Sequence, residues 1–157
     1  MNTQNLPDKA GVIMFPPLLY VLVLLAGIAI SLIFPNHFIN FSIALPLGSL
    51  LFLSGLFTML RAGRTFIKNK NPINPSGSTQ LIIKSGIYKY TRNPMYVSFS
   101  IMYVGISLLT NAWCSFLLLF PLLVLVQKGI IEREERYLTR KFGGEYVDYK
   151  TKVRRWI

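Results

Sequence analysis

The chain has 157 residues, of which 52% are hydrophobic and only 15% are charged. No Asp, Glu, Lys or Arg occurs between residues 10 and 60 or between residues 93 and 127. A soluble domain carries about 25% charged residues and cannot bury two such stretches, and a disordered chain is excluded by the same hydrophobicity. Composition therefore predicts an all-α integral membrane protein, which we treat as a single membrane domain over residues 1–157.

The basic residues are concentrated in blocks that flank the two apolar stretches. The formal net charge is +11, and the 17 Lys and Arg residues lie at Lys9, within residues 61–92 and within residues 128–155. Such blocks are typical of the cytoplasmic loops of membrane proteins, so we prefer that interpretation to a nucleic-acid-binding surface. No nucleic-acid partner is expected.

Each apolar stretch is predicted to hold two helices, which gives about four transmembrane helices. In the first stretch, the turn signal at Phe34–Pro35–Asn36–His37 separates a helix over residues 12–34 from one over residues 41–64. In the second, a helix opens at Pro94, and a shorter hairpin turns at Thr110–Asn111. Each arm of that hairpin barely reaches across a bilayer, since a spanning helix needs about 20 residues.

The fourth helix is predicted to continue beyond the membrane. Its pattern runs on to Phe142, where Gly143 and Gly144 form a stop signal. A short amphipathic helix then places Tyr146 and Tyr149 on one face. Because the turns between helices one and two and between helices three and four are uncharged, we expect both termini and the 61–93 segment to be cytoplasmic.

Three glutamates follow the second apolar stretch. Glu132 has a basic residue four positions before it and another four positions after it, an ordinary pairing on a helix surface. Glu134 and Glu135 have no basic residue three or four positions away in either direction. Unpaired carboxylates are unfavourable beside an anionic lipid surface. We therefore expect a cation to compensate at least one of them, either Arg92 or another basic residue across the bundle, or a bound cationic ligand.

Two sequence blocks and the hairpin between them resemble the isoprenylcysteine carboxyl methyltransferase family and the related phospholipid N-methyltransferases. Residues 86–96 read GIYKYTRNPMY, and residues 134–149 read EERYLTRKFGGEYVDY. The family pattern is roughly G-P-Y-x-x-x-R-H-P-x-Y, a hairpin, then E-E-x-x-L-x-x-x-F-G-x-x-Y-x-x-Y. The spacing agrees within each block. Two residues depart from the pattern, since Ile87 replaces the usual proline and Asn93 the usual histidine.

The resemblance implies a membrane enzyme that uses S-adenosylmethionine, releases S-adenosylhomocysteine and methylates a lipophilic acceptor arriving from the bilayer. Residues 12–64 would be scaffold, and residues 80–157 would form the cofactor-binding hairpin and the cytoplasmic C-terminal segment. The cofactor-binding residues implied in this way are Tyr88, Arg92, Asn93, Pro94, Tyr96, Glu134 and Glu135.

Physical chemistry agrees with these roles. Arg92 and the N-terminus of helix three would supply positive charge for the cofactor carboxylate, and Asn93 would cap that helix. The two glutamates would supply negative charge for its cationic groups. Adjacent helical residues point about 100° apart, so the sequence leaves open which glutamate faces the cofactor. Arg92 and Glu135 are the expected catalytic residues.

The identity of the acceptor is less determined. A carboxylate acceptor needs no base, whereas an ammonium must first lose a proton, and the single histidine, His37, lies in the turn on the opposite side. This favours a carboxylate or thiolate, with Tyr146, Tyr149 and Arg154 as expected acceptor contacts; Arg155 is an alternative to Arg154. A phospholipid or small-molecule N- or S-methyltransferase and a non-catalytic membrane adaptor are the alternatives. No metal site is expected, and the oligomeric state stays open.

Overall fold

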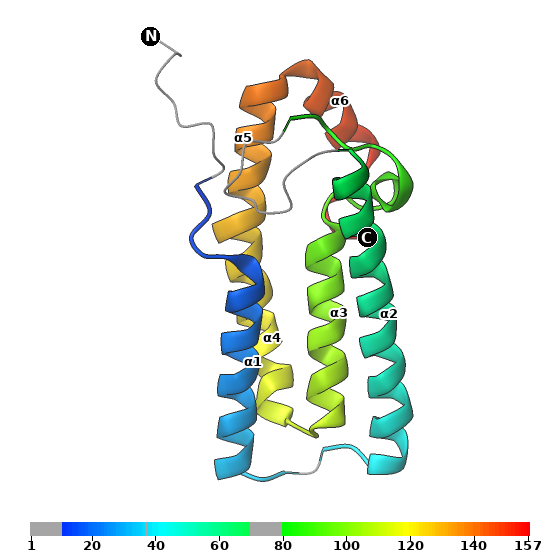
Figure 1. Ribbon diagram of the computed structural model, residues 1–157. Helices are drawn as coiled ribbons and strands as arrows, with labels where there is room; N and C mark the ends of the chain where they lie inside the picture. The colour runs from blue at the N-terminus through cyan, green and yellow to red at the C-terminus, as the bar shows by residue number, and fades with distance from the viewer. Residues whose placement is uncertain (1–10, 37, 70–79) are drawn as a thin grey trace.

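The computed structural model describes residues 11–36, 38–69 and 80–157, and these residues form an all-helical bundle (Figure 1). In chain order the elements are α1 (Pro16–Ile33), α2 (Phe41–Lys68), the 3-10 turn η2 (Gly86–Lys89), α3 (Pro94–Leu109), α4 (Trp113–Val126), the π-helical segment η3 (Gln127–Ile131), α5 (Glu132–Phe142) and α6 (Gly144–Lys152). The all-α prediction is confirmed for the described part of the chain.

The predicted helices are present, with shifts of about one turn at some ends. α1 begins at Pro16 rather than Val12, because the Pro16–Pro17 pair occupies the first turn, where missing N–H groups matter least. α2 extends to Lys68, one turn beyond the predicted end. Its start is capped by Asn40, whose side chain accepts a hydrogen bond from the Ser42 amide. His37 lies outside the described residues.

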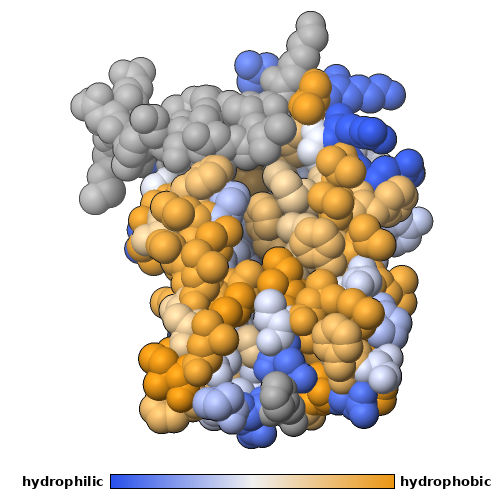
Figure 2. All heavy atoms as spheres, turned by 60° about the horizontal axis from the view of Figure 1, so that its bottom comes forward, coloured by the Kyte–Doolittle hydropathy of each residue, from blue (hydrophilic) through white to orange (hydrophobic). Residues whose placement is uncertain are grey.

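The apolar helices have membrane-spanning dimensions. α1, α2 and the continuous helix from Trp113 to Phe142 are each long and apolar enough to cross a bilayer, and α3 is a shorter apolar helix. Large apolar side chains are exposed along their flanks, as Figure 2 shows, including Leu32, Leu50 and Phe120. Flanks of this kind require hydrocarbon around them. The protein is therefore an integral membrane protein with three long apolar helices and a fourth shorter one.

The bundle is held together by close helix pairs, α2 against α3 and α1 against α4 (Figure 1). A Cβ atom added to Gly105 of α3 would lie 2.7 Å from the Phe52 nitrogen and 2.8 Å from the Gly48 oxygen. A Cβ on Gly27 of α1 would likewise lie 2.5 Å from the Ser115 Cα. Glycines therefore bring the backbones together, which is how helices gain packing contacts inside lipid.

The long fourth helix positions the acidic turn. α4, η3 and α5 form one uninterrupted helix through Phe142, as predicted, and Gly143 ends it with a positive φ of 55°. α5 therefore projects past the apolar part of the bundle, at the end where η2, the N-terminus of α3 and the C-terminal residues also lie (Figure 1). We call residues 153–156 the C-terminal strap.

Candidate active site

The segment before α3 is fixed by backbone contacts with the C-terminal strap. Thr91 forms an isolated parallel bridge with Arg154, and the Arg92 amide donates to the Arg154 carbonyl at 2.9 Å. The Asn93 side chain caps nothing in α3; its Nδ2 donates to the Arg155 carbonyl at 2.9 Å. The expectation that Asn93 caps helix three with its side chain is therefore wrong. The Thr91 hydroxyl accepts a hydrogen bond from the Asn93 backbone N–H, and the Asn93 side-chain amide anchors the strap.

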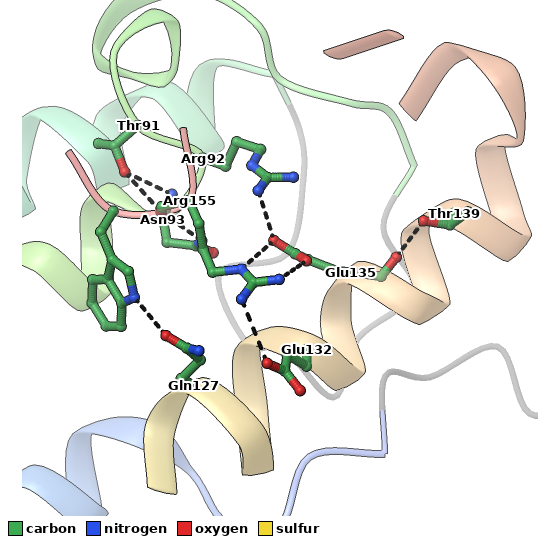
Figure 3. Close-up of polar contacts among 9 residues, drawn as sticks. Thr91, Arg92, Asn93, Gln127, Glu132, Glu135, Thr139 and Arg155 are labelled. Atoms are coloured by element: carbon green, nitrogen blue, oxygen red, sulfur yellow. Dashed lines mark hydrogen bonds and ion pairs between the residues drawn. The ribbon is translucent and has the colours of Figure 1, made fainter. Parts of the chain in front are cut away.

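Glu135 lies between two arginines (Figure 3). The Arg155 guanidinium grips both carboxylate oxygens, with Nε 3.0 Å from Oε1 and Nη2 2.8 Å from Oε2. Arg92 reaches the same carboxylate with one nitrogen, Nη2, 3.2 Å from Oε1. Only 6% of the Glu135 side chain and 9% of the Arg92 side chain are exposed. Such pairs gain strength from burial but become costly when one partner is removed.

These contacts answer which cation compensates the acidic pair. Glu135 is compensated from across the bundle by Arg92, which was one of the predicted alternatives, and by Arg155. Glu132 is paired with Arg155 as well, at 3.5 Å, and not with the basic residues one turn away on its own helix. The acidic cluster is therefore tied to distant parts of the chain and not to its helical neighbours.

Glu134 has a different environment from its neighbour. Its Oε1 accepts a hydrogen bond from the Tyr96 hydroxyl at 2.7 Å. No Lys or Arg of the described ranges forms an ion pair with it. Within the described ranges, Glu134 is therefore the member of the acidic pair without an ionic partner, which makes it the candidate to face a cationic ligand.

Arg92 retains donors that no protein group uses. Within the described part of the chain, its Nε and Nη1 are buried and have no hydrogen-bond partner. An arginine that only marked the cytoplasmic side would extend into water, since a buried guanidinium with unused donors is costly. These two nitrogens lie on different edges of the planar guanidinium, so each can donate a hydrogen bond to an oxygen of an anionic ligand. The structure thus combines a buried arginine that has donors to offer an anionic group with a half-buried glutamate, Glu134, that has no ionic partner among the described residues.

Buried tyrosines surround these charges. Tyr88 and Tyr96 are 5% and 8% exposed, so both lie inside the protein and not in an aromatic belt facing lipid headgroups. Tyr146 and Tyr149 are also buried, with ring centroids 6.2 Å apart, and the Tyr149 hydroxyl donates to the Tyr88 carbonyl at 2.7 Å. Tyr149 thereby joins α6 to η2.

The tyrosine hydroxyls of this cluster keep their protons. Burial raises the pKa of Tyr149 to about 12, and Arg92 partly opposes that shift. Burial also raises the pKa of Tyr146, with the Glu135 charge adding to it, and burial raises the pKa of Tyr88. At neutral pH these phenols donate hydrogen bonds and do not act as bases.

The remaining predicted site residues differ in burial and in the contacts that they make. Pro94 is buried at the first position of α3 and shapes the turn after Arg92. The Arg154 side chain is exposed, and its backbone holds the Arg92 segment. Arg155 is the residue whose part in the site the sequence failed to reveal. A pair of basic residues at the end of a basic segment gave no signal to separate an exposed arginine from one that grips Glu135.

Comparison with known proteins places the chain in a family. The family model described as phospholipid methyltransferase matches residues 25–145. The protein-S-isoprenylcysteine O-methyltransferase of Saccharomyces cerevisiae is 31% identical over 135 residues, which cover 78% of this chain and 54% of that protein. The Schizosaccharomyces pombe protein of the same name is 34% identical over 95 residues, covering 60% of this chain and 39% of that protein.

These comparisons have a limited reach. The chain spans about half the length, or less, of the two yeast proteins that it matches. An uncharacterised Haemophilus influenzae protein is 38% identical over 63 residues, covering 36% of this chain and all of that protein. No solved structure matches. The resemblance seen in the two sequence blocks is confirmed, and since the family model covers most of the chain, the protein belongs to the phospholipid methyltransferase family, with relatives among the isoprenylcysteine O-methyltransferases.

Proposed function

We propose that the protein is an S-adenosylmethionine-dependent membrane methyltransferase that methylates a lipophilic carboxylate. The name of its yeast relatives, protein-S-isoprenylcysteine O-methyltransferase, states O-methylation for those proteins. The observation that carries the proposal is Arg92, a buried guanidinium whose Nε and Nη1 have no partner in the described part of the chain. A buried group with unused donors is expected where a ligand supplies the acceptors. S-adenosylmethionine carries a carboxylate, an ammonium and a sulfonium, and so needs both signs of charge.

Each residue of the cluster has a role in this proposal. The free donors of Arg92 bind the cofactor carboxylate, and Glu134 faces a cationic group of the same ligand. Tyr96 holds the Glu134 carboxylate in place through its 2.7 Å hydrogen bond. Glu135 keeps the Arg92 side chain at the site. The sequence predicted a catalytic role for Glu135. In this proposal Glu135 only holds Arg92 in place, because its oxygens are already bound to two guanidinium groups.

The chemistry asked of the protein is positioning and exclusion of water. When bound, S-adenosylmethionine supplies a methyl group that is activated by the sulfonium charge. The protein has to align the acceptor with that methyl group and keep water out, which the buried tyrosines around Arg92 favour. The apolar flanks of the bundle give a lipophilic acceptor a route from the bilayer.

The nature of the acceptor follows from the available bases. The protonated hydroxyl of Tyr146 can orient a carboxylate by donating a hydrogen bond, whereas that of Tyr149 already donates to the Tyr88 carbonyl. A carboxylate also needs no base. An amine acceptor would require a group that takes its proton, and Glu134 is the glutamate of the polar cluster that forms no ion pair with a described residue. If Glu134 is occupied by the cofactor, a carboxylate is favoured over an amine.

The orientation in the membrane is part of the proposal. The polar cluster lies at the end of the bundle that carries the basic residues of α5 and α6 (Figure 1), and this end is expected to be cytoplasmic. Single cysteines introduced at Thr110 and Thr151, in a chain carrying Cys114→Ser, should be labelled from opposite sides of the membrane. Labelling of both from the outside would contradict this orientation.

Calorimetric titration of the detergent-solubilised protein with S-adenosylmethionine tests the cofactor. We expect binding by the wild type, and a loss of affinity of about tenfold or more for Glu134→Gln, the scale of one charged hydrogen bond. Glu145→Gln is the matched control, because Glu145 forms an exposed ion pair with Lys84 away from the cluster. Absence of binding by the wild type would overturn the proposal and favour a non-catalytic adaptor.

Methyl transfer from labelled cofactor then distinguishes the acceptors. The wild type should methylate an S-prenylated cysteine that has a free carboxylate, and the methyl group should be released by mild base, as expected of an ester. Base-stable methylation of a phospholipid amine in vesicles, without ester formation, would show that the acceptor is an amine.

A further inference from the structure

The C-terminal strap contributes a charged side chain to the cluster that neither sequence block contains. Arg155 binds both oxygens of Glu135 in a two-pronged contact at 3.0 and 2.8 Å and also reaches Glu132 at 3.5 Å. The Glu135 hydrogen bond is the largest factor that raises the Arg155 pKa. Arg155 therefore remains charged, and its planar guanidinium takes the contact geometry that arginine and carboxylate prefer.

The strap is fixed on both sides of that side chain. The Arg155 carbonyl accepts hydrogen bonds from the Asn93 amide group and from the Thr91 hydroxyl, the latter at 3.2 Å. The next residue, Trp156, donates from Nε1 to the Gln127 side chain at 3.1 Å and packs against the main apolar core. Arg155 is thus presented to Glu135 from a segment that is anchored to both α3 and the long fourth helix.

Two arginines therefore compete for one buried carboxylate, and they share it unequally. Arg155 takes the two-pronged contact, while Arg92 is left with a single contact through Nη2. The Nε and Nη1 of Arg92 consequently stay without a partner in the described residues. If Arg155 were absent, Glu135 would be free to turn and take a two-pronged contact with Arg92 through Nη2 and one of its neighbours, which would consume one of the two donors left for a ligand.

We infer that Arg155 is a positioning residue for the anion-binding arginine: by occupying Glu135, it keeps the free donors of Arg92 available for the carboxylate of the bound cofactor. The inference rests on the proposed function, since it names what keeps that site competent. Arg155 does not contact the ligand in this scheme and acts only through Glu135 and Arg92.

The test uses two ligands that differ by the group in question. S-adenosylhomocysteine carries the amino-acid carboxylate, and 5′-methylthioadenosine lacks it. Arg155→Ala should weaken S-adenosylhomocysteine binding about tenfold, the scale of one charged hydrogen bond, and leave methylthioadenosine binding unchanged. Equal loss for both ligands would show that the strap is merely structural, and no loss for either would remove Arg155 from the site.

Conservative and background variants keep the test decisive if Arg155→Ala folds poorly. Arg155→Lys retains the charge but cannot make the two-pronged contact. It should therefore weaken S-adenosylhomocysteine binding by less than Arg155→Ala does and leave methylthioadenosine binding unchanged. In a Glu135→Gln background, Arg155→Ala should cause no further loss, because its effect passes through Glu135. An added tenfold loss there would overturn the inference.

Two further measurements separate this inference from the function on which it rests. Lys152→Ala is the matched charge control, since Lys152 is exposed at the end of α6, and its affinity for both ligands should equal that of the wild type. If the wild type binds neither ligand, the proposed function is contradicted. If the wild type binds both ligands and the Arg155→Ala variant binds each as tightly as the wild type does, only the positioning role is contradicted.

Discussion

The α2–α3 contact within the membrane and the polar cluster above it are both tightly packed, but for opposite reasons. Between α2 and α3 the backbones meet at Gly48, Gly55 and Gly105, and no charged side chain takes part. Above them, Glu135 is bound by Arg92 and Arg155 with its side chain 6% exposed. The first region depends on the absence of side-chain volume, and the second depends on the pairing of Glu135 with two arginines.

The difference determines how each region responds to change. The glycine contact does not tolerate added atoms. A Cβ at Gly105 would meet backbone atoms, which cannot move cheaply, whereas a Cβ at Gly48 or Gly55 would first meet a side-chain atom of α3. The charged cluster tolerates small changes of shape but not loss of one partner, because an unpaired buried charge is costly. Both regions contribute to stability, and only the second is proposed to bind the ligand. Four substitutions, taken in order of decreasing expected effect, test that division.

Loss of the shared carboxylate should have the largest effect. Glu135→Gln removes the only ionic partner of Arg92 among the described residues and leaves Arg155 with Glu132 alone. It should lower the free energy of unfolding by about 3–5 kcal/mol. Thermal unfolding in detergent measures the change, and Glu145→Gln, at an exposed pair, should cost less than about 1 kcal/mol. Equal losses would mean that the cluster contributes no special stability.

Added volume between α2 and α3 should come next. Gly105→Ala places a Cβ 2.7 Å from the Phe52 nitrogen, and it should destabilise the protein by about 3 kcal/mol, the upper end for overpacking. Gly63→Ala is the matched control in α2, since a Cβ there meets nothing within 4 Å. It should be neutral or stabilising, because alanine favours helices over glycine. An unchanged unfolding temperature for Gly105→Ala would contradict the close backbone contact.

A change in the shape of the ligand-binding cation should alter binding but not folding. Arg92→Lys keeps the positive charge beside Glu135 but loses the planar donors, so S-adenosylmethionine affinity should fall by about 2 kcal/mol, roughly 30-fold. Arg64→Lys, the same substitution at an exposed position of α2, should leave the titration unchanged. Indistinguishable affinities of wild type and Arg92→Lys would remove Arg92 from the site.

The smallest effect is expected for the anchor of the strap. Asn93→Ala removes the 2.9 Å hydrogen bond to the Arg155 carbonyl and should lower the free energy of unfolding by about 1 kcal/mol, the usual value of one hydrogen bond. The Thr91 hydroxyl still holds the same carbonyl, so cofactor affinity should change little. A loss comparable to that of Glu135→Gln would show that Asn93 does more than anchor the strap.

The sequence by itself determined the membrane class, the helix count, the continuous fourth helix and its end at Gly143. These features depend on apolar runs, proline and glycine positions and the placement of charge, all of which act over a few residues. The family resemblance also identified most of the cluster, including Arg92 and Glu134. It could not do the same for Arg155, because nothing in the sequence distinguishes Arg155 from the other basic residues between positions 128 and 155.

Only the tertiary structure decided which glutamate forms ion pairs and how Arg92 and Arg155 share the Glu135 carboxylate. Glu134 and Glu135 are neighbours in the sequence, yet one contacts Tyr96 of α3 and the other Arg92 and Arg155. Their side chains have different partners because they point in different directions from α5, one toward α3 and the other toward Arg92 and the strap. Charge pairing over such sequence distances depends on how helices cross, and no local pattern in the chain encodes that geometry.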